Sequence, residues 1–174
     1  DAGGFPWTEI NQAREFEHEV RLGMSPIEAI RSATTVAAEP AISSPRGVAI
    51  TRDGFAYLGN FGVGDAIYKV DLATGAVTTV PAPGSSPLLT APTEVTLSPD
   101  ERYLYFANRQ AGNELVGRVE LSTGAVTKVA DLQGPTGIAQ LKDGGLLVNS
   151  SDMDLVHRIS PAGALSTFSP GPGY

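Results

Sequence analysis

Residues 45–60 read PRGVAITRDGFAYLGN, and residues 67–80 read IYKVDLATGAVTTV. Together they contain four short runs with β-branched or aromatic residues, and a turn signal such as Asp-Gly or Thr-Gly closes a run. Runs of this kind are typical of β-strands, and the turn residues end each strand after a few positions. The stretch therefore predicts a unit of four short strands.

The same unit occurs three times along the chain. It begins again at Pro92 and at Pro135, so the opening prolines lie 47 and 43 residues apart. Four strands repeated every roughly 40–50 residues are the signature of β-propeller blades. We therefore predict a mainly β fold with three four-stranded blades, over residues 45–80, 92–129 and 135–168.

Glycines mark the turns expected within each blade. Gly54 and Gly144 each follow an aspartate between the first two strands, where a tight turn needs a residue with positive φ. Glycine tolerates a positive φ, and Glu101, which has this place in the second unit, suits the turn less well. A second set of glycines lies between the third and fourth strands, where a three-residue hairpin loop needs a left-handed residue. This set consists of Gly75, Gly124 and Gly163.

The repeated pattern P-x-G-[VI]-A, x-D-G and V-D-x-x-T-G resembles the SMP-30/gluconolactonase, strictosidine-synthase-like and NHL propellers over residues 45–168. The resemblance implies a six-bladed ring, of which three blades would be half. It also implies a central metal, which lactonases of this group hold with Glu, Asn or Asp at the blade starts. The matching residues here are Arg46, Thr93 and Thr136, which are poor ligands for a hard cation. The pattern therefore argues against a metal lactonase within these blades.

Composition and charge limit the classes of function. The chain has 174 residues, of which 41% are hydrophobic and 18% charged, as in globular proteins. Its net charge of −7 argues against nucleic acid and against an anionic membrane surface as partners. No cysteine is present, and no apolar run approaches the about 20 residues that span a membrane. We expect a soluble protein, and the sequence leaves a secreted, periplasmic or cytoplasmic location open.

Residues 1–39 have a different pattern, which predicts an α-helical hairpin. Thr8 is a suitable N-cap for a first helix, which Gly23 would end. Ser25-Pro26-Ile27-Glu28 forms a capping box that would start a second helix, which reaches about Glu39. We expect residues 40–44 to be a linker and residues 169–174 to be a flexible tail.

The predicted hairpin resembles the C-terminal end of metal-dependent amidohydrolases, chiefly through G-M-S-P-x-E-A at residues 23–29. The resemblance implies that Asp1 is a metal ligand or proton shuttle. The histidine ligands of that family are missing, because the chain has only His18 and His157, in unrelated segments. We therefore expect no cofactor, and a divalent metal, Zn or Ca, only if the chain is part of a hydrolase. A tail without its barrel favours a fusion, a fragment or a recombined gene.

Asn60, Asn108 and Ser150 occupy equivalent places at the ends of the second strands. They could line one face of the ring and bind a polar ligand. Asn and Ser are also common turn residues that bond their own backbone, and we favour that role. The sequence has no nucleophile elbow and no glycine-rich phosphate loop.

Two classes of function follow from these patterns. The first is a ligand-binding or scaffold half-propeller that completes its ring by oligomerisation and has no complete catalytic site of its own. The alternative is part of a metal-dependent hydrolase, either amidohydrolase or SMP-30-like lactonase. Three blades leave two apolar lateral faces uncovered, so we expect a homodimer that closes a six-bladed ring, together with a small polar ligand.

Overall fold

A computed structural model describes residues 42, 44–61, 66–81 and 86–168 of the chain. Contacts divide the chain into two units, Asp1–Glu39 and Pro40–Tyr174, and all described residues belong to the second. The helical hairpin predicted for residues 1–39 and the tail at 169–174 lie outside the described residues. Within the described part the structure has no helix, and so none long and apolar enough to cross a membrane.

The described residues form three antiparallel sheets of four strands each. We call these sheets blade one, blade two and blade three. In each blade the strands lie in the order in which they follow along the chain. The prediction of a mainly β fold with three four-stranded units is confirmed, and the sheets are consistent with propeller blades.

The strand boundaries follow the repeat read from the sequence. Blade one consists of β1 (Pro45–Ile50), β2 (Phe55–Asn60), β3 (Ala66–Asp71) and β4 (Val77–Thr79). Blade two consists of β5 (Pro92–Leu97), β6 (Tyr103–Gln110), β7 (Asn113–Glu120) and β8 (Val126–Asp131). Blade three consists of β9 (Pro135–Gln140), β10 (Leu146–Ser150), β11 (Leu155–Ile159) and β12 (Leu165–Phe168).

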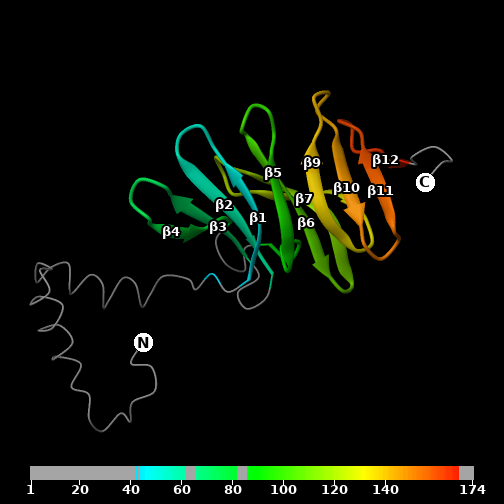
Figure 1. Cartoon of the computed structure of the whole chain (residues 1–174), viewed down its shortest axis with the longest axis horizontal. Coiled ribbons are helices and arrows are strands. Elements are labelled where there is room, and N and C mark those ends of the chain that lie inside the picture. Colours follow the sequence, from blue (N-terminus) through cyan, green and yellow to red (C-terminus); the bar gives the residue numbers. More distant parts are fainter. Residues whose placement is uncertain (1–41, 43, 62–65, 82–85, 169–174) are drawn as a thin grey trace, which may run out of the picture. The chain divides into compact units, whose positions relative to one another are not determined.

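Blade two lies between the other two blades, as Figure 1 shows. The first strands of the blades are neighbours, because β5 contacts both β1 and β9. β4 and β12 lie at the outer ends of their sheets, far from these first strands. The first strands therefore line the inner side of the array, as the inner strands of propeller blades do.

Two apolar cores join the blades. The first junction, between blades one and two, buries Tyr57 and Ile67 against Leu104 and Phe106. A second set of buried residues fills the junction between blades two and three: Val116, Leu132, Ile138, Leu146, Val148 and Ile159. Neighbouring strand residues point to opposite faces of a sheet, so each blade presents one apolar face to the blade before it and one to the blade after it.

Blade two accommodates its largest core residue by a glycine on the neighbouring strand. Phe106 on β6 is fully buried and pairs with Gly117 on β7. A Cβ atom at Gly117 would lie 2.3 Å from the end of the Phe106 ring. The ring therefore lies flat across the sheet, where any larger residue at 117 would displace it.

The turns have the backbone conformations that the sequence predicted. Gly75, Gly124 and Gly163 all have positive φ, at 74°, 72° and 85°. In the turn between the first two strands, Gly54 has a φ of 90°, and Glu101 adopts the same left-handed region at 56°. Glu101 is therefore a non-glycine residue in a conformation that costs roughly 1–2 kcal/mol for L-residues.

Glu101 also carries a contact between blades one and two. Its carboxylate accepts the backbone N–H of Arg52 at 3.2 Å and pairs with the Arg52 guanidinium at 3.3 Å. We predict that Glu101→Gly is more stable than Glu101→Ala by about 1 kcal/mol, because both remove the carboxylate but only glycine relieves the backbone. Chemical denaturation of the two variants measures this difference, and equal midpoints would show that the turn carries no strain.

Candidate functional site

All three blades begin with the same irregularity in their inner strand. Each opening proline pairs with the second strand of its blade, and the pairing then shifts by one residue: Pro45 with Asn60, Pro92 with Asn108 and Pro135 with Ser150. Each inner strand therefore carries a β-bulge directly after its proline. Bulges re-aim side chains and are common beside active sites. The bulges lie at Arg46, Thr93 and Thr136 or directly beside them.

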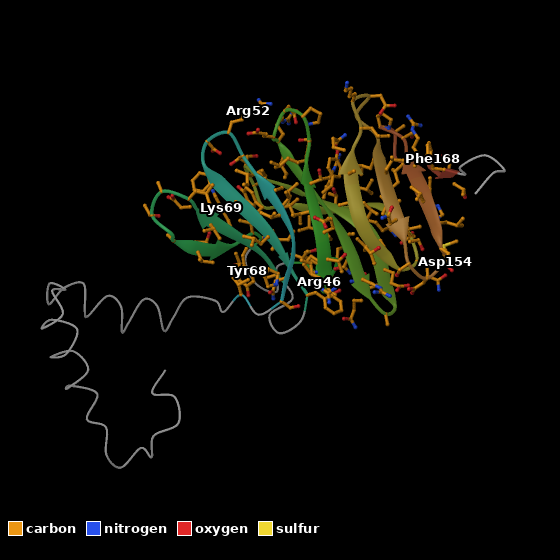
Figure 2. All side chains as sticks on the ribbon, viewed as in Figure 1. Arg46, Arg52, Tyr68, Lys69, Asp154 and Phe168 are labelled. Atoms are coloured by element: carbon orange, nitrogen blue, oxygen red, sulfur yellow. The ribbon has the colours of Figure 1, made fainter. Side chains whose placement is uncertain are left out.

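The three bulges meet at one pocket. A cavity of about 280 Å³ is lined by residues from the starts of the inner strands and from the ends of the second strands. We call it the blade-start pocket, and its lining residues are Arg46, Phe61, Thr93, Glu94, Arg109 and Thr136. Figure 2 shows Arg46 at the lower end of blade one, opposite Arg52. The positions that the family resemblance singled out for a metal therefore do converge in space.

Two guanidinium groups give the pocket its positive charge. Arg46 is exposed, and its Cζ lies 5.1 Å from the centre of the Phe61 ring, which is within the range of a cation–π contact. Arg109 donates to Asp152 at 2.9 Å, in a pair that solvent reaches on both sides. The in-plane N–H donors at the edges of both groups suit a carboxylate or another planar anion.

Glu94 is the single carboxylate that lines the pocket. It stands over Gly47, where a Cβ would lie 2.1 Å from the carboxylate and 2.7 Å from the Glu94 backbone. The bare backbone of Gly47 therefore lets blades one and two approach closely at their starts. Glu94 can accept hydrogen bonds from hydroxyl or ammonium groups of a ligand. The neighbouring Arg46 and Arg109 can bind an acidic group of the same ligand.

The threonine hydroxyls already have backbone partners. Thr93 is buried and lies within hydrogen-bond distance of the carbonyl oxygens of Ala107 and Thr136, each at 3.2 Å. Thr136 donates to the carbonyl of Asn149 at 3.5 Å. The lining of the blade-start pocket fits a divalent cation badly, because it contains two guanidinium groups and one carboxylate. Among the described residues, no three His, Cys, Asp or Glu side chains cluster to hold a metal ion.

The residues predicted as ligand contacts lie next to this pocket and are buried. Asn108 accepts the backbone N–H groups of Thr90 and Ala91 at 2.9 and 2.8 Å and donates to the carbonyl of Asn113 at 2.7 Å. Asn60 accepts the N–H of Ser44 at 2.9 Å. These side chains tie the segment before each inner strand to the end of the second strand.

Ser150 has the same place in blade three. Its hydroxyl donates to the carbonyl of Gln133 at 2.6 Å and accepts the N–H of Met153 at 3.2 Å. Most of these contacts reach a segment that is distant in the sequence and not the turn of the residue itself, and both the turn role and the ligand-binding role of the three residues stay predictions. Asp1 lies outside the described residues.

Sequence reasoning missed Glu94, Phe61 and Arg109 as pocket residues. One signal was available for Glu94, because the corresponding residue of the other two blades is glycine, at Gly47 and Gly137. A carboxylate that replaces a repeated glycine marks a departure from the repeat. Arg109 and Phe61 carried no such signal, because loop ends vary freely between blades.

Comparison with known proteins supports the fold. No family model matches the chain. The chain is 34% identical over 73 residues to the seven-bladed beta-propeller protein Rv1057 of Mycobacterium tuberculosis, a match that covers 42% of this chain and 17% of that protein. Virginiamycin B lyase from Staphylococcus aureus superposes with a TM-score of 0.58 at 18% identity, over 75% of this chain and 43% of the lyase.

A third similar protein is from Bacteroides fragilis and is provisionally assigned as a 6-phosphogluconolactonase. It matches with a TM-score of 0.54 at 25% identity, over 72% of this chain and 38% of that protein. The chain thus spans less than half the length of each of these proteins. Its described part is beta-propeller-like, with neighbours among the virginiamycin lyases and gluconolactonase-like proteins. The amidohydrolase resemblance of residues 1–39 stays a prediction.

We predict that Asn108→Ala lowers the free energy of unfolding by about 2–3 kcal/mol, because it leaves buried N–H and C=O groups without partners. The matched control is Asn149→Ala, which removes an exposed amide from the neighbouring blade and should change stability by less than about 0.5 kcal/mol. Urea denaturation compares the two variants. An unchanged midpoint for Asn108→Ala would contradict a structural role and leave its amide free for a ligand.

Proposed function

We propose that this chain is a ligand-binding half-propeller, which a second copy completes into a closed ring. The ring would bind a small polar ligand at the blade-start pocket. The observation that carries the proposal concerns the outermost faces of blades one and three. These faces carry apolar residues at the same positions of the repeat as the faces that are buried between blades, but here the residues are more exposed.

The free face of blade one has apolar residues at the same positions as the faces of blades two and three that pack against the preceding blade. Val48 lies three residues after its opening proline, as do Val95 in blade two and Ile138 in blade three. Val95 and Ile138 are 3% and 8% exposed, because each packs against the preceding blade, but Val48 is 58% exposed. Ile50, on the same face as Val48, is 61% exposed. This face has the apolar residues of a junction and lacks a preceding blade among the described residues.

The free face of blade three has the same relation to the blade after it. Val156 pairs with the residue before Ser150, at the place that Ile67 and Val116 occupy in their blades. Ile67 and Val116 are fully buried, whereas Val156 is only half-buried. Phe168, the cross-strand partner of Val156, is 50% exposed. A following blade would cover both side chains.

The cost of these exposed faces favours closure. Burying one Val, Ile or Phe side chain contributes about 1.5–3 kcal/mol, and each face carries at least two of them. With two-fold symmetry, blade one of each copy would pack on blade three of the other, so that both junctions form at once. Two-fold dimers are the commonest oligomers, and a closed ring leaves no free face.

Ring closure would also complete the pocket. The inner strands of one copy supply Arg46, Glu94 and the two threonines, and a second copy would supply the same set across the ring axis. Paired guanidinium groups with interspersed carboxylates suit a ligand that carries both an acidic group and hydroxyl or ammonium donors. The site is a binding site in this proposal, because the lining residues contain no nucleophile with an adjacent base.

We predict that the protein is a dimer of twice 18.1 kDa and that charges on either free face make it monomeric. One variant carries Val48→Asp and Ile50→Asp, and the other carries Val156→Asp and Phe168→Asp. Each variant alone should be a monomer, because every junction then contains one charged face. The matched control Met153→Asp changes an exposed apolar residue in a loop and should stay dimeric. Light scattering after gel filtration measures the masses.

Mixing the two variants tests which faces meet. One junction of the mixed pair combines the two intact faces, so a heterodimer should form that neither variant forms alone. No heterodimer would contradict packing of blade one on blade three. A wild-type monomer of 18.1 kDa at micromolar concentration would overturn ring closure by a second copy.

The alternative function, part of a metal-dependent hydrolase, is supported by the lactonase-like neighbour and by the resemblance of residues 1–39. It predicts a stoichiometric divalent ion, Zn or Ca, in the purified protein. Elemental analysis separates the two functions, because the blade-start pocket should hold no such ion if it binds a polar ligand through its guanidinium groups.

A further inference from the structure

A second cavity lies between blades two and three, at the ends of the strands opposite the blade-start pocket. It has a volume of about 240 Å³. Blade two contributes Tyr105, Arg118 and Lys128, and blade three contributes Leu146, Ile159 and the turn at Pro161. We call it the rim crevice. We infer that the rim crevice binds a small aromatic carboxylate, a role that goes beyond the proposed ring closure and blade-start ligand.

The charges of the rim crevice are all positive. Arg118 projects from the face of blade two that borders it, and none of its lining residues is acidic. The whole chain carries a net charge of −7, so a cationic recess of this kind stands out against its surroundings. A negatively charged ligand is repelled by most of the surface and attracted here.

Arg118 is held in position with its terminal nitrogens available. Its Nε donates to the Thr127 hydroxyl at 3.0 Å, and its Cζ lies 4.6 Å from the centre of the Tyr103 ring. In the described part of the chain, no hydrogen bond engages either terminal nitrogen of Arg118. A guanidinium fixed by stacking loses little side-chain entropy when it binds a carboxylate, and it can offer a second pair of parallel donors.

Lys128 has an ionic partner of its own. Its Nζ lies 2.9 Å from both carboxylate oxygens of Asp131. Both side chains are well exposed, and surface pairs of this kind contribute only about 0.2–1 kcal/mol. Lys128 pairs with Gly117 and Asp131 with Leu115, so both side chains project from the face of blade two that meets blade one, and the ion pair leaves Arg118 as the cation of the crevice.

The first junction shows what the same place contains when it is closed. Leu121 and Val126 of blade two, like Phe55 of blade one, are partly buried there and pack against the first core. The corresponding residues of blade three are Pro161, two positions after the buried Ile159, and Leu165, which is 42% exposed. The second junction therefore has the same arrangement of strands as the first. It leaves open the volume that apolar side chains fill in the first junction.

The shape and chemistry of this space select the ligand. Tyr105, Val129 and Pro161 keep exposed apolar surface along the crevice, and Arg118 offers the donor pair for an acidic group. The cavity is smaller than pockets for drug-sized ligands, which occupy about 300–1,000 Å³. A single aromatic ring with one carboxylate has both the apolar body and the planar anion that these residues recognise.

Benzoate is the probe, and benzamide is the matched ligand without charge. Titration of the full chain, followed by 15N-resolved chemical shifts, should show saturable benzoate binding, with the largest shifts at the turns of blade three and around Arg118. Benzamide should bind at least about tenfold more weakly, because charge-assisted hydrogen bonds contribute about 1.5–3 kcal/mol. Equal binding of the two compounds would overturn the proposal.

Three variants locate the site. Arg118→Gln should weaken benzoate binding at least about tenfold. Pro161→Leu restores the residue of the first junction and should close the crevice, so it should abolish binding and keep the circular dichroism spectrum unchanged. Arg102→Gln is the control, because Arg102 also lies beside Tyr103, at 5.5 Å from the ring centre, but outside the crevice. It should bind benzoate as the wild type does.

A fourth variant separates this inference from the proposed function. Arg46→Gln changes the blade-start pocket and should leave benzoate affinity unaltered. Loss of binding in Arg46→Gln with retention in Arg118→Gln would place the ligand in the blade-start pocket and overturn the rim crevice. If the wild-type protein is a monomer and still binds benzoate through Arg118, the result contradicts ring closure and supports the rim crevice.

Discussion

Packing of each blade on the next is the interaction on which the rest of this structure depends. A single four-stranded sheet presents two apolar faces and buries neither by itself. In blade two both faces are covered, so Phe106 and Val116, which point to opposite sides, are both fully buried. Free energy from these junctions holds the inner strands close enough for the blade starts to meet. The sites of the protein are therefore products of blade packing, because no single blade supplies their lining.

The sequence predicted what local sterics decide and missed what depends on contacts between blades. Strand bounds and glycine turns followed from the repeat, and even the poor fit of Glu101 to its turn appeared as a left-handed residue. The convergence of Arg46 with Thr93 and Thr136 followed from their repeated position. The approach of Glu94 to Gly47 needs the register of one blade against another, which no spacing along the chain reveals. The helical hairpin of residues 1–39 stays a prediction.

Polar residues at the strand ends show why one sequence pattern allowed two roles. Proline at a blade start has no N–H, so the backbone at that point has lost a donor for the sheet. Asn108 and Asn60 instead accept the N–H of the residue that precedes the proline, Ala91 and Ser44. An amide that binds backbone and an amide that binds a ligand look identical in sequence. In this structure the two buried amides bind backbone groups, which only the packed chain reveals.

The third strands show how one repeated position acquires different chemistry. Lys69, Arg118 and Arg158 occupy equivalent places, and all are cations. Lys69 lies 3.8 Å from the Phe55 ring centre in a filled junction, and Arg158 binds Asp143 on the free face of blade three. The N–H of Gly145 and the Arg158 guanidinium lower the pKa of Asp143 below that of an ordinary aspartate. Of these three third-strand cations, only Arg118 combines an aromatic support with an open cavity. The same position of the repeat therefore meets a filled junction, a free face or an open cavity, according to the blade that follows.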